Sequence, residues 1–141
     1  MPNILIVDDE KSIRKTLREI LEYEKYQIDE AEDGAQGLKM LKEKSYDAVL
    51  LDIKMPKMDG IEVLDQAREI APDTSFIMIS GHGNVETAVE AVKKGAFDFI
   101  SKPPDLNRLL ITIRNALDKS GLITETKVLK RKVSKTCFSN V

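Results

Sequence analysis

Short apolar runs alternate with amphipathic stretches along most of the chain. Residues 4–7, 48–51 and 76–79 are aliphatic or aromatic throughout, and a polar residue follows each run. Runs of this length and composition are typical of strands that are buried on both faces of a parallel sheet. Weaker runs at 26–31 and 97–100 predict two further strands.

The stretches between these runs have the periodicity of helices. Within residues 12–24, apolar side chains recur at spacings that place them on one helix face: Ile13, Leu17, Ile20 and Leu21. The same periodicity predicts helices at 34–44, 61–70, 84–94 and 105–119. Asn84 and Asp105 stand at expected N-caps, and Gly95 stands where a helix C-terminus is expected.

The order of these elements predicts an α/β fold. Strand and helix alternate five times, which implies a parallel sheet with helices on both faces. In open α/β sheets, sites form beyond the carboxyl ends of the strands. The polar residues that directly follow strands are therefore the candidate functional residues: Asp8, Asp9, Asp52, Ser80 and Lys102.

These five side chains suggest one chemistry. Three carboxylates in one crevice repel each other unless a cation joins them. Oxygen ligands of this kind suit a hard ion such as Mg²⁺, or Mn²⁺ in its place. A lysine and a hydroxyl beside the metal would neutralise charge on a phosphoryl group, and an Asp carboxylate can itself be the nucleophile. We therefore expect metal-assisted phosphoryl transfer onto a carboxylate.

Each signal alone also has a simpler structural explanation. The acidic run 8–10 fits a charge cluster at a helix N-terminus, where it favours the macrodipole. Asp52 fits a solvated strand end, Ser80 a turn, and Lys102 a surface residue before proline. The placement of all of them at strand ends favours the functional interpretation.

Cysteine, histidine and hydropathy exclude several other classes of protein. The chain has one cysteine, Cys137, and one histidine, His82, which excludes an internal disulfide and zinc sites built from these residues. Its longest apolar runs are about five residues, whereas a membrane-spanning helix needs about 20. The N-terminus lacks the basic start of a secretion signal. We expect a cytoplasmic protein with a reduced thiol.

The net charge of −2 hides two unlike parts. Residues 1–118 have 16 basic and 23 acidic side chains, whereas residues 119–141 have six basic and one acidic. All six basic residues lie within 119–135, which has no aromatic residue, and such charge is more typical of a solvated linker than of a nucleic-acid surface. Periodicity in this part is loose, and Gly121 disfavours a continuous helix by about 1 kcal/mol. We therefore predict a domain at 1–119 and a basic tail at 120–141, partly helical or disordered.

Four segments carry a resemblance to a known family: ILIVDDE at 4–10, VLLDIKMPKMDG at 49–60, SGHG at 80–83 and FDFISKP at 97–103. They resemble the receiver domain of bacterial two-component response regulators, over residues 3 to about 119. Residues 80–113 are similar to the NtrC-like, sigma-54-dependent branch. The resemblance implies a doubly wound, flavodoxin-like or CheY-like fold with strand order 2-1-3-4-5.

The resemblance also implies the roles of the residues at the strand ends. Asp52 corresponds to the phosphoacceptor. Asp8 and Asp9 correspond to the acidic pair that binds Mg²⁺ together with Asp52 and the backbone carbonyl of Lys54. Lys102 corresponds to the lysine that contacts the phosphoryl group.

Further positions are assigned on the same basis. Ser80 and Phe99 stand at the two switch positions of the family, although an aromatic residue in a strand is usually simply core. Lys54 and His82 stand where the dephosphorylation rate is tuned, although a histidine between two glycines also fits a solvated loop. Pro103 stands where the family has a cis peptide, which an X–Pro bond adopts at low cost.

The family implies a signalling role rather than an enzyme, apart from catalysis of its own phosphorylation and dephosphorylation. The expected partners are a sensor histidine kinase and a second copy, bound through 84–94, 97–100 and 105–119. AAA+ and DNA-binding output domains have no counterpart in this sequence, which is therefore either an excised receiver or a stand-alone product. We expect no membrane or direct nucleic-acid contact.

Two other functions remain alternatives at this point. A pseudo-receiver would share the fold and bind partners constitutively, but the intact Asp52, Lys102, Asp8 and Asp9 argue against it. A small-molecule phosphatase or flavodoxin-like binder would need a general acid or a Gly-rich phosphate loop, and the sequence has no GxxxxGK[ST] motif.

Overall fold

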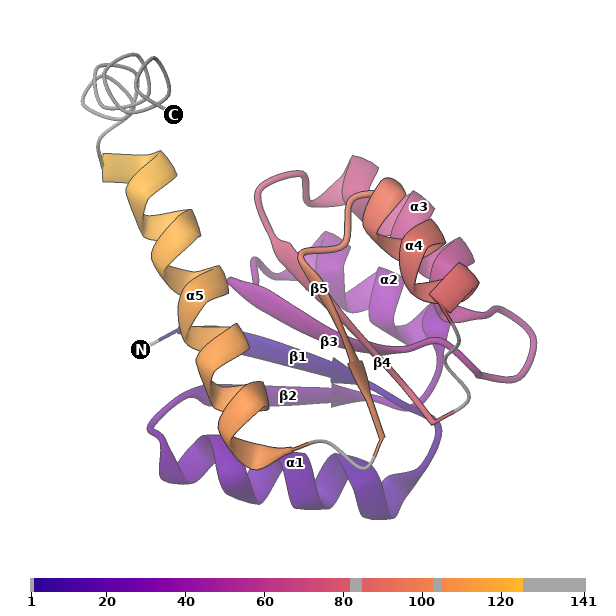
Figure 1. Ribbon diagram of the computed structural model, residues 1–141, viewed down its shortest axis with the longest axis horizontal. Helices are drawn as coiled ribbons and strands as arrows, with labels where there is room; N and C mark the ends of the chain where they lie inside the picture. Colours follow the sequence, from indigo (N-terminus) through magenta and orange to yellow (C-terminus); the bar gives the residue numbers. More distant parts are fainter. Residues whose placement is uncertain (1, 82–84, 103–104, 126–141) are drawn as a thin grey trace.

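A computed structural model describes residues 2–81, 85–102 and 105–125. The strands are β1 (Asn3–Val7), β2 (Gln27–Ala31), β3 (Ala48–Asp52), β4 (Ser75–Ser80) and β5 (Asp98–Ser101). The helices are α1 (Lys11–Tyr23), α2 (Gly34–Glu43), α3 (Gly60–Ile70), α4 (Val85–Lys93) and α5 (Leu106–Glu125), as Figure 1 shows. Every strand and helix that the hydrophobic pattern predicts is present, with ends shifted by a few residues at most except at the end of α5.

The five strands form one parallel sheet with the order β2-β1-β3-β4-β5, which confirms the expected topology. Val7 lies opposite Leu51, Asp52 opposite Ile79, and Ser80 opposite Ser101. All strands point the same way, so their carboxyl ends meet at one edge of the sheet (Figure 1). Within the sheet, β2 lies next to one edge of β1 and β3 lies next to its other edge. The strand order therefore reverses direction between β1 and β3, which is the switch point.

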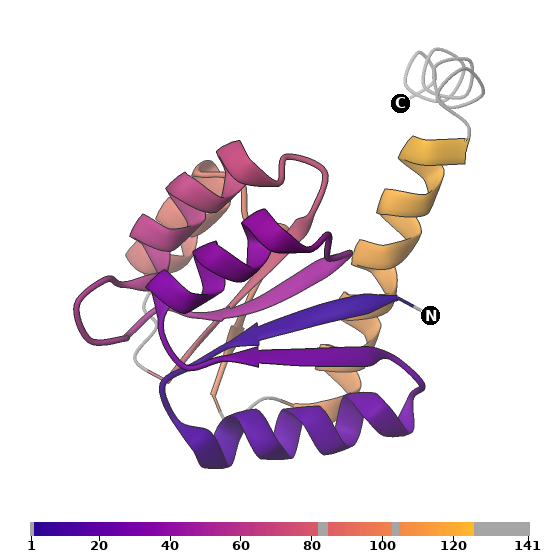
Figure 2. The same cartoon turned by 180° about the vertical axis from the view of Figure 1, so that it is seen from behind.

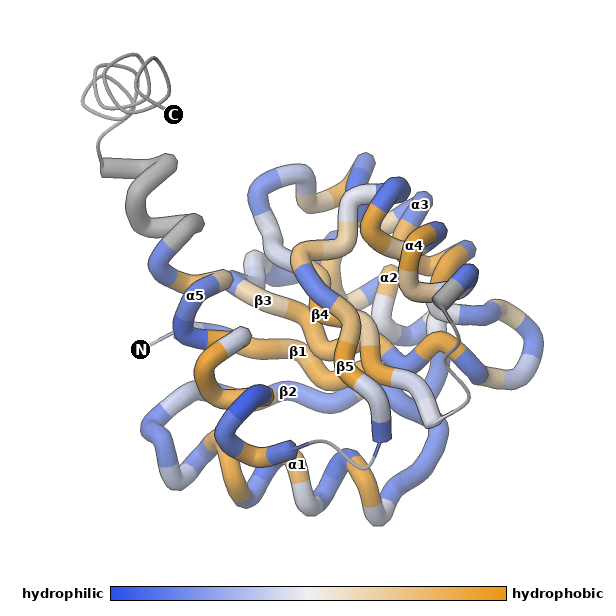
Figure 3. The backbone as a smooth tube through the Cα atoms, viewed as in Figure 1, coloured by the Kyte–Doolittle hydropathy of each residue, from blue (hydrophilic) through white to orange (hydrophobic). Residues whose placement is uncertain are grey.

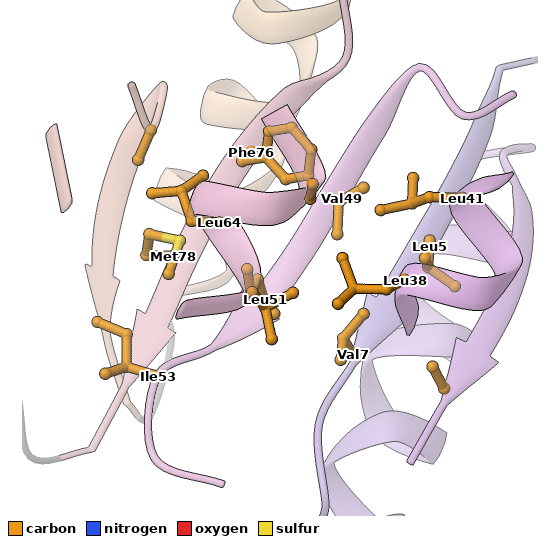
Figure 4. Close-up of a cluster of buried hydrophobic side chains, with 14 of the residues drawn as sticks. Leu5, Val7, Leu38, Leu41, Val49, Leu51, Ile53, Leu64, Phe76 and Met78 are labelled. Carbon is orange, nitrogen blue, oxygen red and sulfur yellow. The ribbon is translucent and has the colours of Figure 1, made fainter. Parts of the chain in front are cut away.

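Helices cover both faces of the sheet, with α1 and α5 on one side and α2, α3 and α4 on the other (Figures 1 and 2). Because side chains alternate along a strand, each apolar run contributes side chains to two hydrophobic cores, one on each face of the sheet. Leu5, Val49 and Phe76 pack towards α2 to α4 (Figure 4), whereas Ile4 and Leu50 pack towards α1 and α5. This explains why these runs show no polar alternation, and why the inner parts of the central strands are coloured as hydrophobic in Figure 3.

Two helices end in the same hydrogen-bonded turn. After α1, the N–H of Lys25 donates to the carbonyl of Glu22 at 2.9 Å, and that of Tyr26 donates to Leu21 at 3.2 Å. After α4, Gly95 and Ala96 make the equivalent bonds. This Schellman motif needs a left-handed residue, which is Gly95 with φ of 105° after α4 but Lys25 with φ of 68° after α1.

Lys25→Gly is therefore expected to raise the free energy of unfolding by about 0.5–1 kcal/mol. Glycine removes the left-handed strain of a side-chain-bearing residue, and this gain exceeds its larger loss of backbone entropy. Urea unfolding followed by circular dichroism measures the change. Lys25→Ala is the matched control, because it removes the same side chain but keeps the strain. Equal stabilities of the two variants would contradict the explanation.

The last helix continues into the predicted tail, which was expected to be partly helical or disordered. It runs to Glu125, past the expected boundary at residue 119 and through Gly121. Its final turns extend beyond the edge of the sheet in both views (Figures 1 and 2). The first part of the predicted tail is thus helical, while residues 126–141 lie outside the described part, as does the predicted cap Asn84. Within the described ranges, no helix combines the length and apolar character that crossing a membrane requires.

Candidate functional site

The carboxyl edge of the sheet gathers the candidate residues from three strand ends. Asp8 follows β1, Asp52 ends β3, and Lys102 follows β5. Hydrogen bonds continue the sheet past two of these ends, since Asp8 N–H donates to Ala31 at 3.1 Å and Lys102 N–H donates to the carbonyl of Ser80 at 3.0 Å. The backbone positions of Asp8 and Lys102 are therefore set by neighbouring strands.

The ammonium group of Lys102 joins the acidic side chains. Its Nζ atom lies 3.0 Å from Asp8 Oδ2, 3.5 Å from Asp52 Oδ2 and 3.9 Å from Glu10 Oε1. The side chains of Asp8 and Asp52 are each 4% exposed, and that of Lys102 is 13% exposed. Three of the residues expected at this edge thus lie together, as two nearly buried carboxylates that share one nearly buried cation.

Burial and mutual charge change the protonation of this cluster. Burial, and then the negative charge of Asp8, raises the pKa of Asp52 to about 6, although the Lys102 ammonium and the N–H of Lys54 act in the opposite direction. Burial alone would lower the pKa of Lys102, but its hydrogen bond to Asp8 and the surrounding carboxylates raise it above its usual value. Lys102 is therefore a permanent cation, while Asp52 is an anion at neutral pH that binds a proton readily in mild acid.

The loop after β3 fixes Asp52 from the other side. The backbone N–H of Lys54 favours the ionised form of the Asp52 carboxylate and so acts to lower its pKa. The chain then returns at Gly60, whose N–H donates to the carbonyl of Ile53 at 2.7 Å. A Cβ atom on Gly60 would meet the carbonyl oxygen of Asp52 and lie 2.7 Å from Ile53 Cα. Only glycine permits this close approach of two main-chain segments.

The acidic run before α1 forms a set of oxygen donors. Ligand atoms of Asp8, Asp9 and Glu10 all lie within 4.8 Å of one another. Asp8 is buried, whereas Asp9 and Glu10 are exposed and remain accessible to an incoming ion. A buried carboxylate with two exposed carboxylates beside it fits a hard divalent cation such as Mg²⁺ or Mn²⁺. Glu10 is the N-cap residue of α1, so the run also stands at a helix N-terminus, where its charge favours the macrodipole.

The remaining predicted residues lie in different places. Ser80 is buried at the end of β4, on the same edge as Asp52. Phe99 lies further back on β5, opposite Met78, and packs partly buried against the core shared with α2 to α4. His82 and Pro103 lie outside the described residues.

Sequence reasoning missed two side chains at this site. Glu10 comes within 3.9 Å of Lys102, and Arg14 donates from Nη1 to the carbonyl oxygen of Asp8 at 2.7 Å. Glu10 stands two residues after Asp8 and Arg14 one helical turn later. Their spacing was the available signal, but it does not tell whether these residues turn towards the sheet edge or towards solvent.

Comparisons with known proteins agree with this geometry. A family model described as the response regulator receiver domain matches residues 4–114. The nitrogen assimilation regulatory protein NtrX of Azorhizobium caulinodans is 40% identical over 131 residues, which cover 92% of this chain and 29% of that protein. The chain spans 28–29% of the length of the curated relatives it matches.

The chain is also similar to solved structures of receiver domains. A CheY-like receiver domain protein from Methanospirillum hungatei has a TM-score of 0.83 and 34% identity, covering 86% of this chain and 97% of that one. The receiver domain of NtrC4, solved as a beryllofluoride-activated dimer, has a TM-score of 0.81 and 42% identity, covering 85% of this chain and 99% of that one.

Proposed function

The chain belongs to the response regulator receiver domain family, and on this premise we propose that it accepts a phosphoryl group on Asp52. Its relatives of the NtrX and NtrC type place it in two-component signalling. The single observation that supports the acceptor role is the pair of nearly buried carboxylates, Asp52 and Asp8, held by one Lys102 ammonium at the carboxyl edge of the sheet.

The donor in this proposal is the phosphohistidine of a sensor histidine kinase. A carboxylate oxygen of Asp52 forms the new P–O bond while the P–N bond to the donor imidazole breaks, and the electron pair leaves with the nitrogen. With a pKa of about 6, Asp52 is ionised at neutral pH and available for attack. Lys102, within 3.5 Å of its carboxylate, offsets charge on the transferred group.

Mg²⁺ or Mn²⁺ would be held by Asp8, Asp9, Asp52 and the backbone carbonyl of Lys54. Three carboxylates carry more negative charge than one lysine neutralises, and a bound divalent ion would supply the missing positive charge. The close spacing of Asp8 and Asp9 supports this assignment. Glu10 belongs to the same cluster as a third, neighbouring acid. Hydrolysis of the acyl phosphate would end the signal, with Lys54 and His82 setting its rate.

The output of the switch would run through Ser80 and Phe99 to the face formed by α4, β5 and α5. This face has the apolar character of an interface. Among the described residues, most large exposed hydrophobic side chains lie on its two helices: Val89, Val92, Leu106 and Ile111. The NtrC4 receiver, solved as an activated dimer, supports homodimerisation, and the choice of this face rests on its exposed apolar side chains.

The full-length protein is proposed to regulate transcription. The chain spans 28–29% of the length of its curated relatives, which leaves room in such proteins for AAA+ and DNA-binding output domains. The extension of α5 to Glu125, beyond the sheet, is a suitable connection to the next domain. The activity would then be signalling, limited chemically to gain and loss of one phosphoryl group.

Incubation with acetyl phosphate and Mg²⁺ is expected to add the mass of one phosphoryl group to the wild-type chain, measured by mass spectrometry. Asp52→Asn is expected to abolish this gain, because the amide is not a nucleophile of this kind. Asp59→Asn is the matched control, since it lies in the same loop and asparagine caps α3 equally well. The mass gain should also require Mg²⁺.

Two results would contradict the proposal. One is an unmodified wild-type chain across several phosphoryl donors, and the other is the same mass gain in Asp52→Asn. Calorimetric titration with Mg²⁺ separates a pseudo-receiver from a phosphoacceptor, since a pseudo-receiver is expected to bind no ion.

A further inference from the structure

Arg14 is the most enclosed cation of α1 among those whose partners the structure describes. Its side chain is 12% exposed, although it lies on a helix that faces solvent along one side. The Nη1 atom donates to the carbonyl oxygen of Asp8 at 2.7 Å, and Nε donates to Glu30 Oε1 on β2 at 3.1 Å. A guanidinium group with so little exposure is stable only when its donors have such partners.

The bond to Asp8 matters because of the peptide to which that carbonyl belongs. The carbonyl of Asp8 and the N–H of Asp9 are parts of one planar unit, so a bond that fixes the first also orients the second. The next amide, that of Glu10, donates to Asp8 Oδ1 at 2.9 Å. One bond from Arg14 thus acts on the segment that carries all three acids of the donor cluster.

We propose that Arg14, anchored by Glu30, is a positioning residue that holds the Asp8–Asp9 peptide so that the acidic side chains converge on a divalent cation. The bond to Asp8 is to the main chain, so Arg14 leaves the carboxylate oxygens available for other partners. The inference rests on the proposed function in one respect, namely that the acidic cluster binds Mg²⁺.

A neighbouring residue separates this role from a general stabilising one. Arg18 also pairs with Glu30, at 2.7 Å, and with Glu22 at 3.2 Å. In the contacts described for these residues, Arg18 does not reach Asp8, and its side chain is 43% exposed. Glu30 therefore serves two arginines, of which only Arg14 connects it to the site.

The test compares Arg14→Gln with the matched control Arg18→Gln by calorimetric titration of Mg²⁺. Arg14→Gln is expected to weaken Mg²⁺ binding on the order of tenfold, as is typical when a residue that orients metal ligands is removed. Arg18→Gln should stay close to the wild type. Arg14→Lys, which keeps one donor for the Asp8 carbonyl, should recover part of the affinity. In acetyl phosphate assays, Arg14→Gln should need more Mg²⁺ but reach a similar rate at saturation.

A second measurement does not depend on the metal. Amide hydrogen exchange of Glu10, observed by NMR, should be faster in Arg14→Gln and unchanged in Arg18→Gln. Equal Mg²⁺ affinity or equal exchange in the two variants would overturn the positioning role. If the wild type binds no Mg²⁺, the metal assignment fails by itself, and the exchange rates still decide whether Arg14 orders this segment. Arg14→Lys replaces Arg14→Gln if the latter does not fold.

Discussion

Gly60→Ala is expected to lower the free energy of unfolding by about 3 kcal/mol or more. The added methyl group would collide with the carbonyl oxygen of Asp52 and lie 2.7 Å from the Cα atom of Ile53. Both neighbours are main-chain atoms at the end of a central strand, so no rotamer change relieves the contact. The loop cannot retreat without losing the 2.7 Å hydrogen bond from Gly60 to Ile53.

The same collision should impair the site, because Asp52 is part of the strand end that would have to move. Urea unfolding and the rate of phosphorylation by acetyl phosphate measure the two effects. Gly81→Ala is the matched control at a neighbouring strand end. Among the described residues, its new methyl group would meet only side-chain atoms of Lys102, at 3.7 and 3.8 Å, which is ordinary contact. A Gly60→Ala variant as stable as Gly81→Ala would show that the loop is not held against β3.

The fold could be predicted because its signals are local. Ile4 and Leu5 point to opposite faces and are both fully buried, which requires an apolar run with no alternation. Parallel strands then place their carboxyl ends on one edge. For that reason Asp8, Asp52 and Lys102, far apart in the sequence, could be assigned to one site before their distances were known.

What the sequence did not reveal depends on orientation within an element. The contact of Arg14 with Asp8 needs the angle between α1 and β1, which periodicity does not determine. The left-handed turn at Lys25 was missed because glycine is the usual signal for that conformation. Gly121 lowers helix propensity by only about 1 kcal/mol, which the surrounding helix tolerates.

In the absence of a metal ion, the ionised acidic cluster also lowers the free energy of unfolding of the chain. Asp52 has a pKa of about 6 in the folded chain against 3.8 for an ordinary aspartate. Between these values the folded state holds a proton that the unfolded state has released, so stability falls as the pH rises through this window. Above about pH 6, the ionised Asp52 destabilises the fold by on the order of 2–3 kcal/mol.

Asp52→Asn is therefore expected to stabilise the metal-free chain by on the order of 2–3 kcal/mol at about pH 8, and by nearly nothing below about pH 4. The amide imitates the protonated acid, which carries no charge against Asp8. Urea unfolding of both proteins across this pH range, with a chelator present, gives the difference. Asp73→Asn is the control, since its side chain is exposed and its effect should be small at every pH.

Adding Mg²⁺ should reduce the stability difference between Asp52→Asn and the wild type. An ion that binds the folded wild type stabilises it by mass action, whereas the variant lacks one of the proposed ligands. A stability difference that is constant from about pH 4 to pH 8 would contradict the argument, as would an Asp52→Asn variant that is less stable than the wild type at the upper end. The negative charge that makes the Asp52 carboxylate a nucleophile therefore also destabilises the fold in the absence of a metal ion.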